Sequence, residues 1–151
     1  MNPIFDALPY LAAFKESFAV LAALSLIALV QSFLCAPLAF INNEQTPGLP
    51  VKHDHSRLSF RVVRTYANST ENLPAFGFAL IAAVVAGASA PLVNWLAFIY
   101  LGFRLAFWVV YYSGMGRVAG GPRTLTYVGG LISNMVLAGA AIWALIAQAH
   151  R

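Results

Sequence analysis

The sequence predicts an all-α integral membrane protein, folded as a single bundle of four transmembrane helices. The first observation is composition: of 151 residues, 60% are apolar and 9% are charged. Soluble domains average roughly 45–50% apolar and about 25% charged residues. The second is that the apolar residues form long stretches without formal charge, and the third is that Cys35 is the only cysteine. Together these observations exclude a disordered chain and a disulfide-stapled secreted domain.

Four spans account for the length of the chain, which we interpret as one domain over residues 1–151. Residues 17–41 carry no formal charge, and a transmembrane helix needs about 20 apolar residues. Residues 72–103 are also uncharged but too long for one crossing, and the turn-forming residues 87–91 divide them. The predicted spans are residues 17–41, 58–86, 92–113 and 124–149.

Basic residues near the span ends predict the orientation of the bundle. They gather in the first connection, with the start of the second span, and in the third connection; the second connection has none. We expect these two connections to face the cytoplasm and both termini to lie on the other side. The net charge of +4 follows from this asymmetry and does not indicate nucleic acid. The Ala-rich composition favours a bacterial inner membrane. The residues concerned are Lys52, Arg57, Arg61, Arg64, Arg117 and Arg123.

A polar stripe runs along the start of the second predicted helix. Its five residues are spaced four, three, four and three apart, which places them within an arc of roughly 80°. One interpretation is a cytosolic extension whose arginines reach lipid headgroups. The other is a polar cavity between helices, because ionisable residues inside a membrane usually mark function. The stripe alone does not decide between these two interpretations. It consists of Arg57, Arg61, Arg64, Asn68 and Glu71.

The third and fourth helices add further polar groups. Arg104 lies midway along an apolar run, and Glu71 is the only acidic residue after position 54, so we expect these two to form an ion pair across helices. Tyr111 lies seven residues after Arg104, on the same face of the third helix. Arg123 and Tyr127 are four residues apart and share a face of the fourth helix. A cavity lined by these residues would suit an anion with more than one negative charge.

These residues resemble a known family. The motif Arg61-x-x-Arg64-x-x-x-Asn68-x-x-Glu71-Asn72-Leu-Pro74, the Arg104 and Tyr111 pair, and Arg123-Thr-Leu-Thr-Tyr127 are similar to the membrane-associated proteins in eicosanoid and glutathione metabolism, or MAPEG. The resemblance implies a homotrimer of four-helix subunits that binds glutathione between neighbouring subunits near the cytosolic face.

The resemblance also implies an activity, glutathione transfer to lipophilic electrophiles that enter from the bilayer, or reduction of a lipid hydroperoxide. Arg123 would be the catalytic residue, because a neighbouring arginine lowers the pKa of a thiol from its usual value near 8.5. No protein nucleophile is needed, and we interpret Cys35 as a packing residue. The implied glutathione-binding residues are Arg61, Arg64, Asn68, Glu71, Arg104, Tyr111 and Tyr127.

Two positions depart from the pattern of glutathione-using members. Ala67 replaces a further basic residue, and Phe107 replaces a histidine or tyrosine. They favour two alternatives, a non-catalytic lipid-binding or partner-presenting protein and an enzyme that uses another thiol; the retained motif favours the glutathione enzyme. His53, Asp54 and His55 are too few for the usual four zinc ligands, so we expect a solvated loop and no metal.

Overall fold

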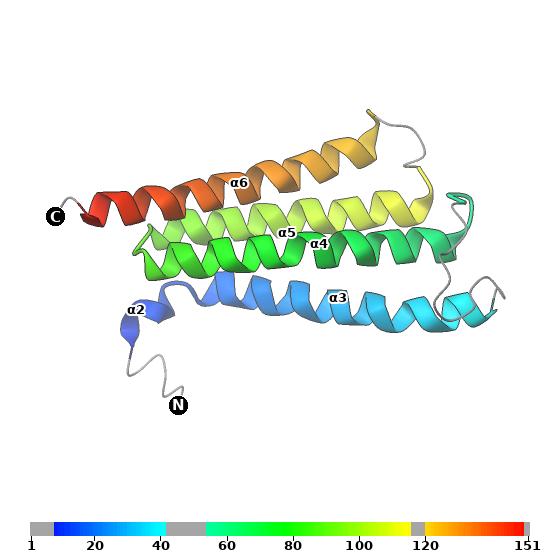
Figure 1. Ribbon diagram of the computed structural model, residues 1–151, viewed down its shortest axis with the longest axis horizontal. Coiled ribbons are helices and arrows are strands. Elements are labelled where there is room, and N and C mark those ends of the chain that lie inside the picture. The colour runs from blue at the N-terminus through cyan, green and yellow to red at the C-terminus, as the bar shows by residue number, and fades with distance from the viewer. Residues whose placement is uncertain (1–7, 42–53, 116–119, 150–151) are drawn as a thin grey trace.

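The computed structural model describes residues 8–41, 54–115 and 120–149, and within them the chain is helical with no strand. The all-α prediction is therefore confirmed for this part of the chain. Figure 1 shows four long helices lying side by side, preceded by one short helix. The helices are α2 (Pro9–Ala12), α3 (Lys15–Ile41), α4 (Leu58–Val85), α5 (Ala90–Ser113) and α6 (Pro122–Ala149).

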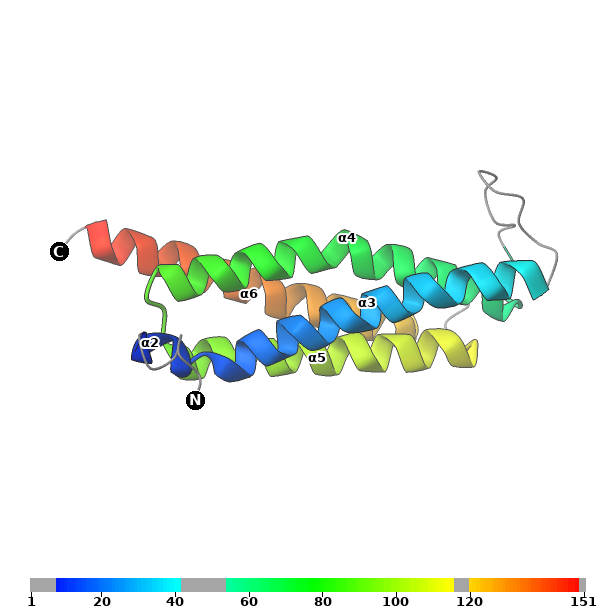
Figure 2. The same cartoon turned by 90° about the horizontal axis from the view of Figure 1, so that it is seen from below.

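The two ends of the bundle differ in character. At one end lie α2, the turn between α4 and α5, and the end of α6 (Figures 1 and 2). At the other, which we call the basic end, α3 and α5 finish while α4 and α6 begin. The basic end therefore brings together the arginine-rich first turns of α4 and Arg123 at the start of α6, although 59 residues separate Arg64 from Arg123.

Glycines set the end of α4 and the end of α5. The charge-free stretch breaks where predicted: α4 finishes at Val85, Gly87 has a φ of 67°, and α5 begins at Ala90. At its other end α5 stops at Gly114, whose φ of 81° is the left-handed conformation that often terminates a helix. Side chains with a Cβ rarely adopt this conformation, so both turns depend on glycine.

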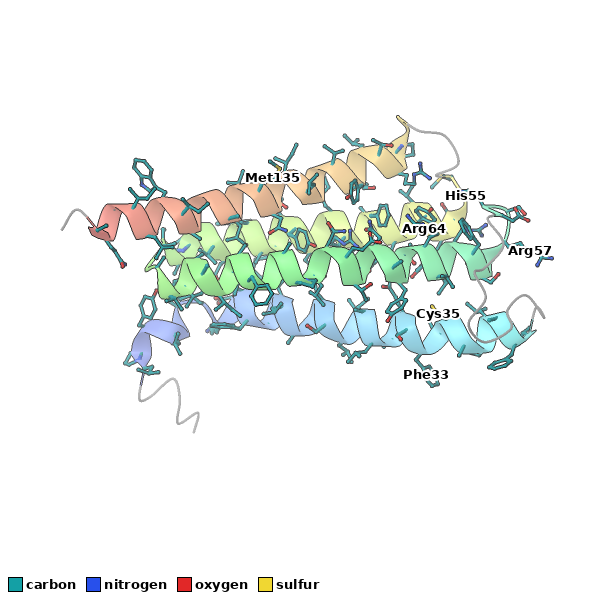
Figure 3. The ribbon with its side chains drawn as sticks, viewed as in Figure 1. Phe33, Cys35, His55, Arg57, Arg64 and Met135 are labelled. Atoms are coloured by element: carbon teal, nitrogen blue, oxygen red, sulfur yellow. The ribbon has the colours of Figure 1, made fainter. Side chains whose placement is uncertain are left out.

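Three helices, α3, α5 and α6, are long and apolar enough to cross a membrane. Their outward faces carry large apolar side chains; Figure 3 shows Phe33 and Met135 pointing away from the bundle, and they are 76% and 64% exposed. Such faces are suited to lipid rather than water. Helix α4 is equally long but is interrupted by the polar stripe and does not belong to this apolar group.

The interior of the bundle is apolar toward the turn between α4 and α5. Phe76 of α4 is fully buried and stacks on Tyr100 of α5, with ring centroids 4.3 Å apart and planes 10° apart. Leu80, Val93 and Leu137 are fully buried nearby in the same cluster. Aromatic stacking and aliphatic packing together fix how α4, α5 and α6 meet.

Nearer the middle, a buried polar network joins α3, α4 and α5. Gln31 donates from Nε2 to the hydroxyl of Tyr112 at 2.9 Å and accepts at Oε1 from Ser69 at 2.8 Å. Thr65 also donates to the Tyr112 hydroxyl, at 2.9 Å, and the indole of Trp108 donates to Ser69 at 3.2 Å. Interhelical hydrogen bonds of this kind contribute about 0.6 kcal/mol each in membrane bundles. These hydrogen bonds have a larger effect on the register of the helices, because each one requires its two residues to lie at the same depth in the bundle.

We expect Gly129→Ala to destabilise the bundle. A Cβ at this position would lie 2.3 Å from Cε1 of Phe103, so the ring of Phe103 would have to move. Overpacking of this kind costs about 1–3 kcal/mol. Thermal unfolding of the detergent-solubilised protein should show a lower melting temperature. Gly139→Ala in the same helix is the matched control, since nothing lies within 4 Å of its added Cβ, and it should melt at or above wild type. Equal melting temperatures for the two variants would contradict this packing.

Candidate functional site

A cavity of about 570 Å³ opens at the basic end of the bundle, between α4, α5 and α6. Its volume is within the range of about 300–1,000 Å³ that is usual for small-molecule sites. Of the eight site residues predicted from the sequence, six line it. The predicted residues are Arg64, Asn68, Glu71, Tyr111, Arg123 and Tyr127; the other lining residues are His55, Phe60, Phe107 and Thr124.

The polar stripe of α4 divides between the cavity and the end of the helix. Arg64, Asn68 and Glu71 line the cavity, as their spacing of four and three residues predicts for one helix face. Arg57 is exposed and points out from the basic end (Figure 3). The cavity interpretation therefore holds for three residues of the stripe, and the interpretation as an exposed extension holds for Arg57.

Arg104 does not form the expected ion pair with Glu71. Arg104 is only 4% exposed, and its guanidinium donates from Nη1 to Oδ1 of Asn68 at 2.7 Å and from Nη2 to Oγ of Ser69 at 3.3 Å. The prediction was wrong because Glu71 is exposed on the cavity side of α4, whereas Arg104 reaches the interior between α4 and α5. Arg104 is not among the residues that line the cavity, and its direct contact with a ligand stays a prediction.

Aromatic rings complete the surroundings of the buried guanidinium. Its central carbon lies 5.2 Å from the ring centroid of Phe107 and 5.7 Å from that of Trp108. Cation–π attraction to desolvated rings stabilises such a charge by about 2 kcal/mol. Phe107, which departs from the family pattern, thus packs against Arg104 on one side and lines the cavity on the other.

The bond from Arg104 also fixes the orientation of Asn68. Because a guanidinium only donates, the Asn68 atom that faces it is the carbonyl oxygen, and the amide nitrogen takes the other position. That nitrogen has no hydrogen-bond partner among the described residues, and Asn68 lines the cavity. The buried pair therefore presents an amide donor to whatever occupies the cavity.

The wall formed by α5 and α6 is aromatic, with one guanidinium. The central carbon of Arg123 lies 5.7 Å from the ring centroid of Tyr111. Phe107 packs against both tyrosines of this wall, with centroids 5.4 Å from Tyr111 and 6.1 Å from Tyr127. Neither Arg123 nor Arg64 forms a salt bridge with a described residue, so both guanidinium groups remain available to an anion.

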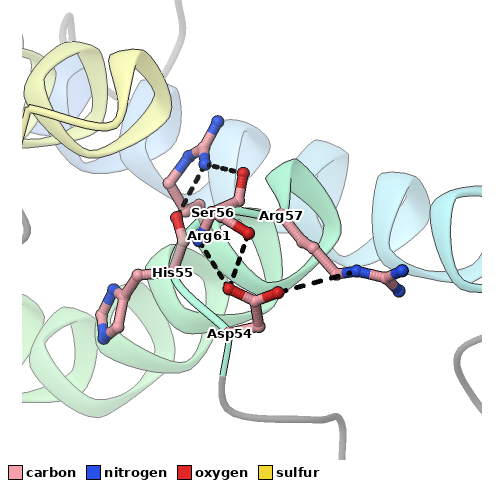
Figure 4. Close-up of polar contacts among 5 residues, drawn as sticks. All are labelled: Asp54, His55, Ser56, Arg57 and Arg61. Atoms are coloured by element: carbon pink, nitrogen blue, oxygen red, sulfur yellow. Dashed lines mark hydrogen bonds and ion pairs between the residues drawn. The ribbon is translucent and has the colours of Figure 1, made fainter.

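Arg61 has a different place from the one predicted. Its Nη1 donates to the backbone carbonyl oxygens of His55 and Ser56, both at 2.8 Å, and so fastens the segment before α4 (Figure 4). Arg61 is not among the residues that line the cavity. Direct binding of a ligand by Arg61 stays a prediction, while its contacts here are with the backbone.

Several residues of the site and its support escaped sequence reasoning. His55 lines the cavity, although the sequence predicted a solvated loop, and no periodic pattern in that segment points to it. Ser69 and Tyr112 belong to the buried network; Gln31, the one strongly polar residue of the first span, was the available signal. His53 and Arg117, also considered from the sequence, lie outside the described residues.

The lining residues have a clear chemical character. They provide two guanidinium groups that form no salt bridge with a described residue, one amide donor, one imidazole, two phenols, one aliphatic hydroxyl and one carboxylate. Guanidinium groups bind carboxylates through paired hydrogen bonds, and Glu71 could accept from an ammonium group. The cavity therefore suits an anion with several charges that also carries a cationic group.

Comparison with known proteins gives one family. A search of curated proteins finds no significant match to the chain. A comparison with protein families matches residues 17–143 to the MAPEG family. The match includes α4 and α5 in full, α3 from Ser17, α6 as far as Trp143, and every residue that lines the cavity. The chain therefore belongs to the MAPEG family.

Proposed function

We propose that this protein is a membrane-embedded, glutathione-dependent transferase and peroxidase that acts on lipophilic electrophiles, and that the cavity at the basic end binds glutathione. The observation that carries the proposal is the cavity itself, which gathers Arg64, Asn68, Glu71 and Arg123 from two helices. Membership in MAPEG supports the same chemistry.

The charges of glutathione match those of the lining residues. At neutral pH the tripeptide carries two carboxylates and one ammonium group. Arg64 and the Asn68 amide would bind carboxylate, and Glu71, the only acidic residue among the described residues that line the cavity, would bind the ammonium. The cavity of about 570 Å³ is large enough for a tripeptide.

Arg123 would activate the thiol. A guanidinium favours the thiolate over the thiol, so the nucleophilic form is populated at neutral pH. In the transferase reaction the thiolate sulfur forms a bond to an electrophilic carbon while a leaving group departs with its electron pair. In the peroxidase reaction two glutathione molecules are oxidised to the disulfide, and the hydroperoxide is reduced to an alcohol and water.

The setting of this reaction is also part of the proposal. We propose that α4 is the fourth membrane span, because it lies alongside the three apolar helices and packs on each of them. The basic end would face the cytoplasm, since basic residues concentrate on that side. We further propose a homotrimer, in which a neighbouring subunit covers the cavity at Arg64 and Glu71, both exposed in the single chain.

A second candidate is a non-catalytic member that binds lipid or presents a partner. Phe107 in the cavity wall favours it, because an apolar ring stands where glutathione-using members carry a polar one. This candidate predicts a stable protein that is indifferent to glutathione.

Glutathione should raise the melting temperature of the detergent-purified protein. A ligand at about 100 times its dissociation constant stabilises the native state by roughly 2.7 kcal/mol. Arg64→Gln and Arg123→Gln should each weaken binding by about tenfold or more, because each removes a charge-assisted hydrogen bond worth about 1.5–3 kcal/mol. Dose-response curves of melting temperature for the three proteins measure this.

Arg57→Gln serves as the matched control, since Arg57 is exposed and outside the cavity. It should respond to glutathione as wild type does. A flat response of the wild-type protein would contradict the glutathione proposal and favour the non-catalytic candidate.

Arg123→Gln should also raise the pKa of the bound glutathione thiol. The neutral amide cannot compensate the thiolate charge, so the pKa should return toward its usual value near 8.5. Titration of the ultraviolet absorbance of the bound thiolate against pH measures the change. At neutral pH the rate of conjugation to an activated aryl halide should fall in parallel. An unchanged thiol pKa in Arg123→Gln would remove Arg123 from the catalytic role.

A further inference from the structure

His55 forms part of the cavity wall, although it precedes α4 and lies outside the polar stripe. Its imidazole meets the ring of Phe60 edge-on, with centroids 4.8 Å apart, and lies 6.0 Å from the ring of Tyr111. Tyr111 is also the ring beneath the guanidinium of Arg123. His55 and Arg123 therefore approach the same phenol from different segments of the chain.

The backbone around His55 is tightly fastened. Asp54 accepts hydrogen bonds at Oδ1 from the backbone nitrogen and the hydroxyl of Ser56, at 2.9 and 2.7 Å, and Arg61 binds the carbonyl oxygens on both sides of the His55–Ser56 peptide bond (Figure 4). Four hydrogen bonds thus hold a segment of three residues. They hold the backbone of His55 in place, and the rings of Phe60 and Tyr111 lie against its imidazole.

The imidazole nitrogens have no hydrogen bond to a described residue. The charged and titratable groups that share the cavity with the ring are Arg64 and Glu71 on α4, Tyr111 on α5, and Arg123 and Tyr127 on α6. On its own segment, the carboxylate of Asp54 is engaged by Ser56 and lies 3.8 Å from Nε of Arg57. A carboxylate of a bound ligand would therefore be a natural acceptor for an N–H of this imidazole.

We propose that His55 is a ligand-binding residue of this cavity, donating a hydrogen bond to a carboxylate of the bound thiol peptide, with Arg61 as its positioning residue. The inference rests on the proposed function and extends it to a segment that the polar stripe does not include. It also gives Arg61 a role at the site through backbone contacts.

The proposal makes affinity depend on pH. An imidazolium adds a third positive charge to those of Arg64 and Arg123, whereas neutral imidazole only donates one hydrogen bond. Histidine usually changes charge between about pH 5 and 8. Binding of an anion should therefore tighten as the pH falls through this range and weaken as it rises.

S-methylglutathione is the probe, because it lacks a thiol and its two carboxylates stay ionised between about pH 6 and 8; any loss of charge from its ammonium group affects wild type and His55→Gln alike. Calorimetric titration of the detergent-solubilised full chain should give binding about three- to tenfold tighter at about pH 6 than at about pH 8. His55→Gln keeps a hydrogen-bond donor but cannot become charged, so its affinity should be nearly independent of pH in this range.

His53→Gln is the control, an identical substitution two residues away, and should keep the pH dependence of wild type. Arg61→Gln should reduce the pH dependence as His55→Gln does, because the imidazole is then no longer held in the cavity; a merely structural role would lower the melting temperature and leave the pH profile unchanged. Gel filtration at both pH values verifies that each variant is folded.

The outcomes separate this inference from the proposed function. If wild type binds S-methylglutathione with the stated pH dependence and only His55→Gln and Arg61→Gln lose it, His55 is the binding residue. If wild type binds but His55→Gln keeps the same profile, the inference is overturned while the glutathione site stands. If wild type does not bind at either pH, the proposed function itself fails.

Discussion

The buried guanidinium of Arg104 is the constraint on which the rest of this structure depends. A charge inside an apolar bundle is costly unless its donors are satisfied, and no described carboxylate pairs with it. Asn68 and Ser69 accept its hydrogen bonds and aromatic rings cover its faces, so α4 and α5 must meet at one depth. Ser69 in turn binds Gln31, which extends the constraint to α3. Register, helix pairing and the direction of the Asn68 amide all follow from this one charge.

With the helices in this register, the bundle has two parts, a packed region and a region with a cavity. Toward the turn between α4 and α5, aromatic and aliphatic packing holds the helices together. Toward the basic end, α4, α5 and α6 surround a cavity lined by two guanidinium groups that form no salt bridge with a described residue. Large apolar side chains cover the outer faces. Three apolar helices and membership in the MAPEG family fit an integral membrane protein.

Much of this arrangement was predictable from the sequence. Charge-free stretches and the Gly87 turn predicted where helices lie, because lipid allows few alternatives, and helical spacing placed Arg64, Asn68 and Glu71 on one face. The partner of Arg104 was not predictable, because opposite charge suggested Glu71. In the structure Asn68 lies at the depth of Arg104 in the bundle and accepts its hydrogen bond. His55 was missed because a fastened loop has no periodicity.

The most direct test is a double-mutant cycle on glutathione affinity with Asn68→Ala, Arg104→Met and their combination. If Arg104 acts on the site by orienting the Asn68 amide, each single variant weakens binding, and the double variant binds about as weakly as Asn68→Ala alone. Independent effects would instead add to within about 0.3–0.5 kcal/mol. Additive losses would contradict the claim that this buried hydrogen bond prepares the cavity for its ligand.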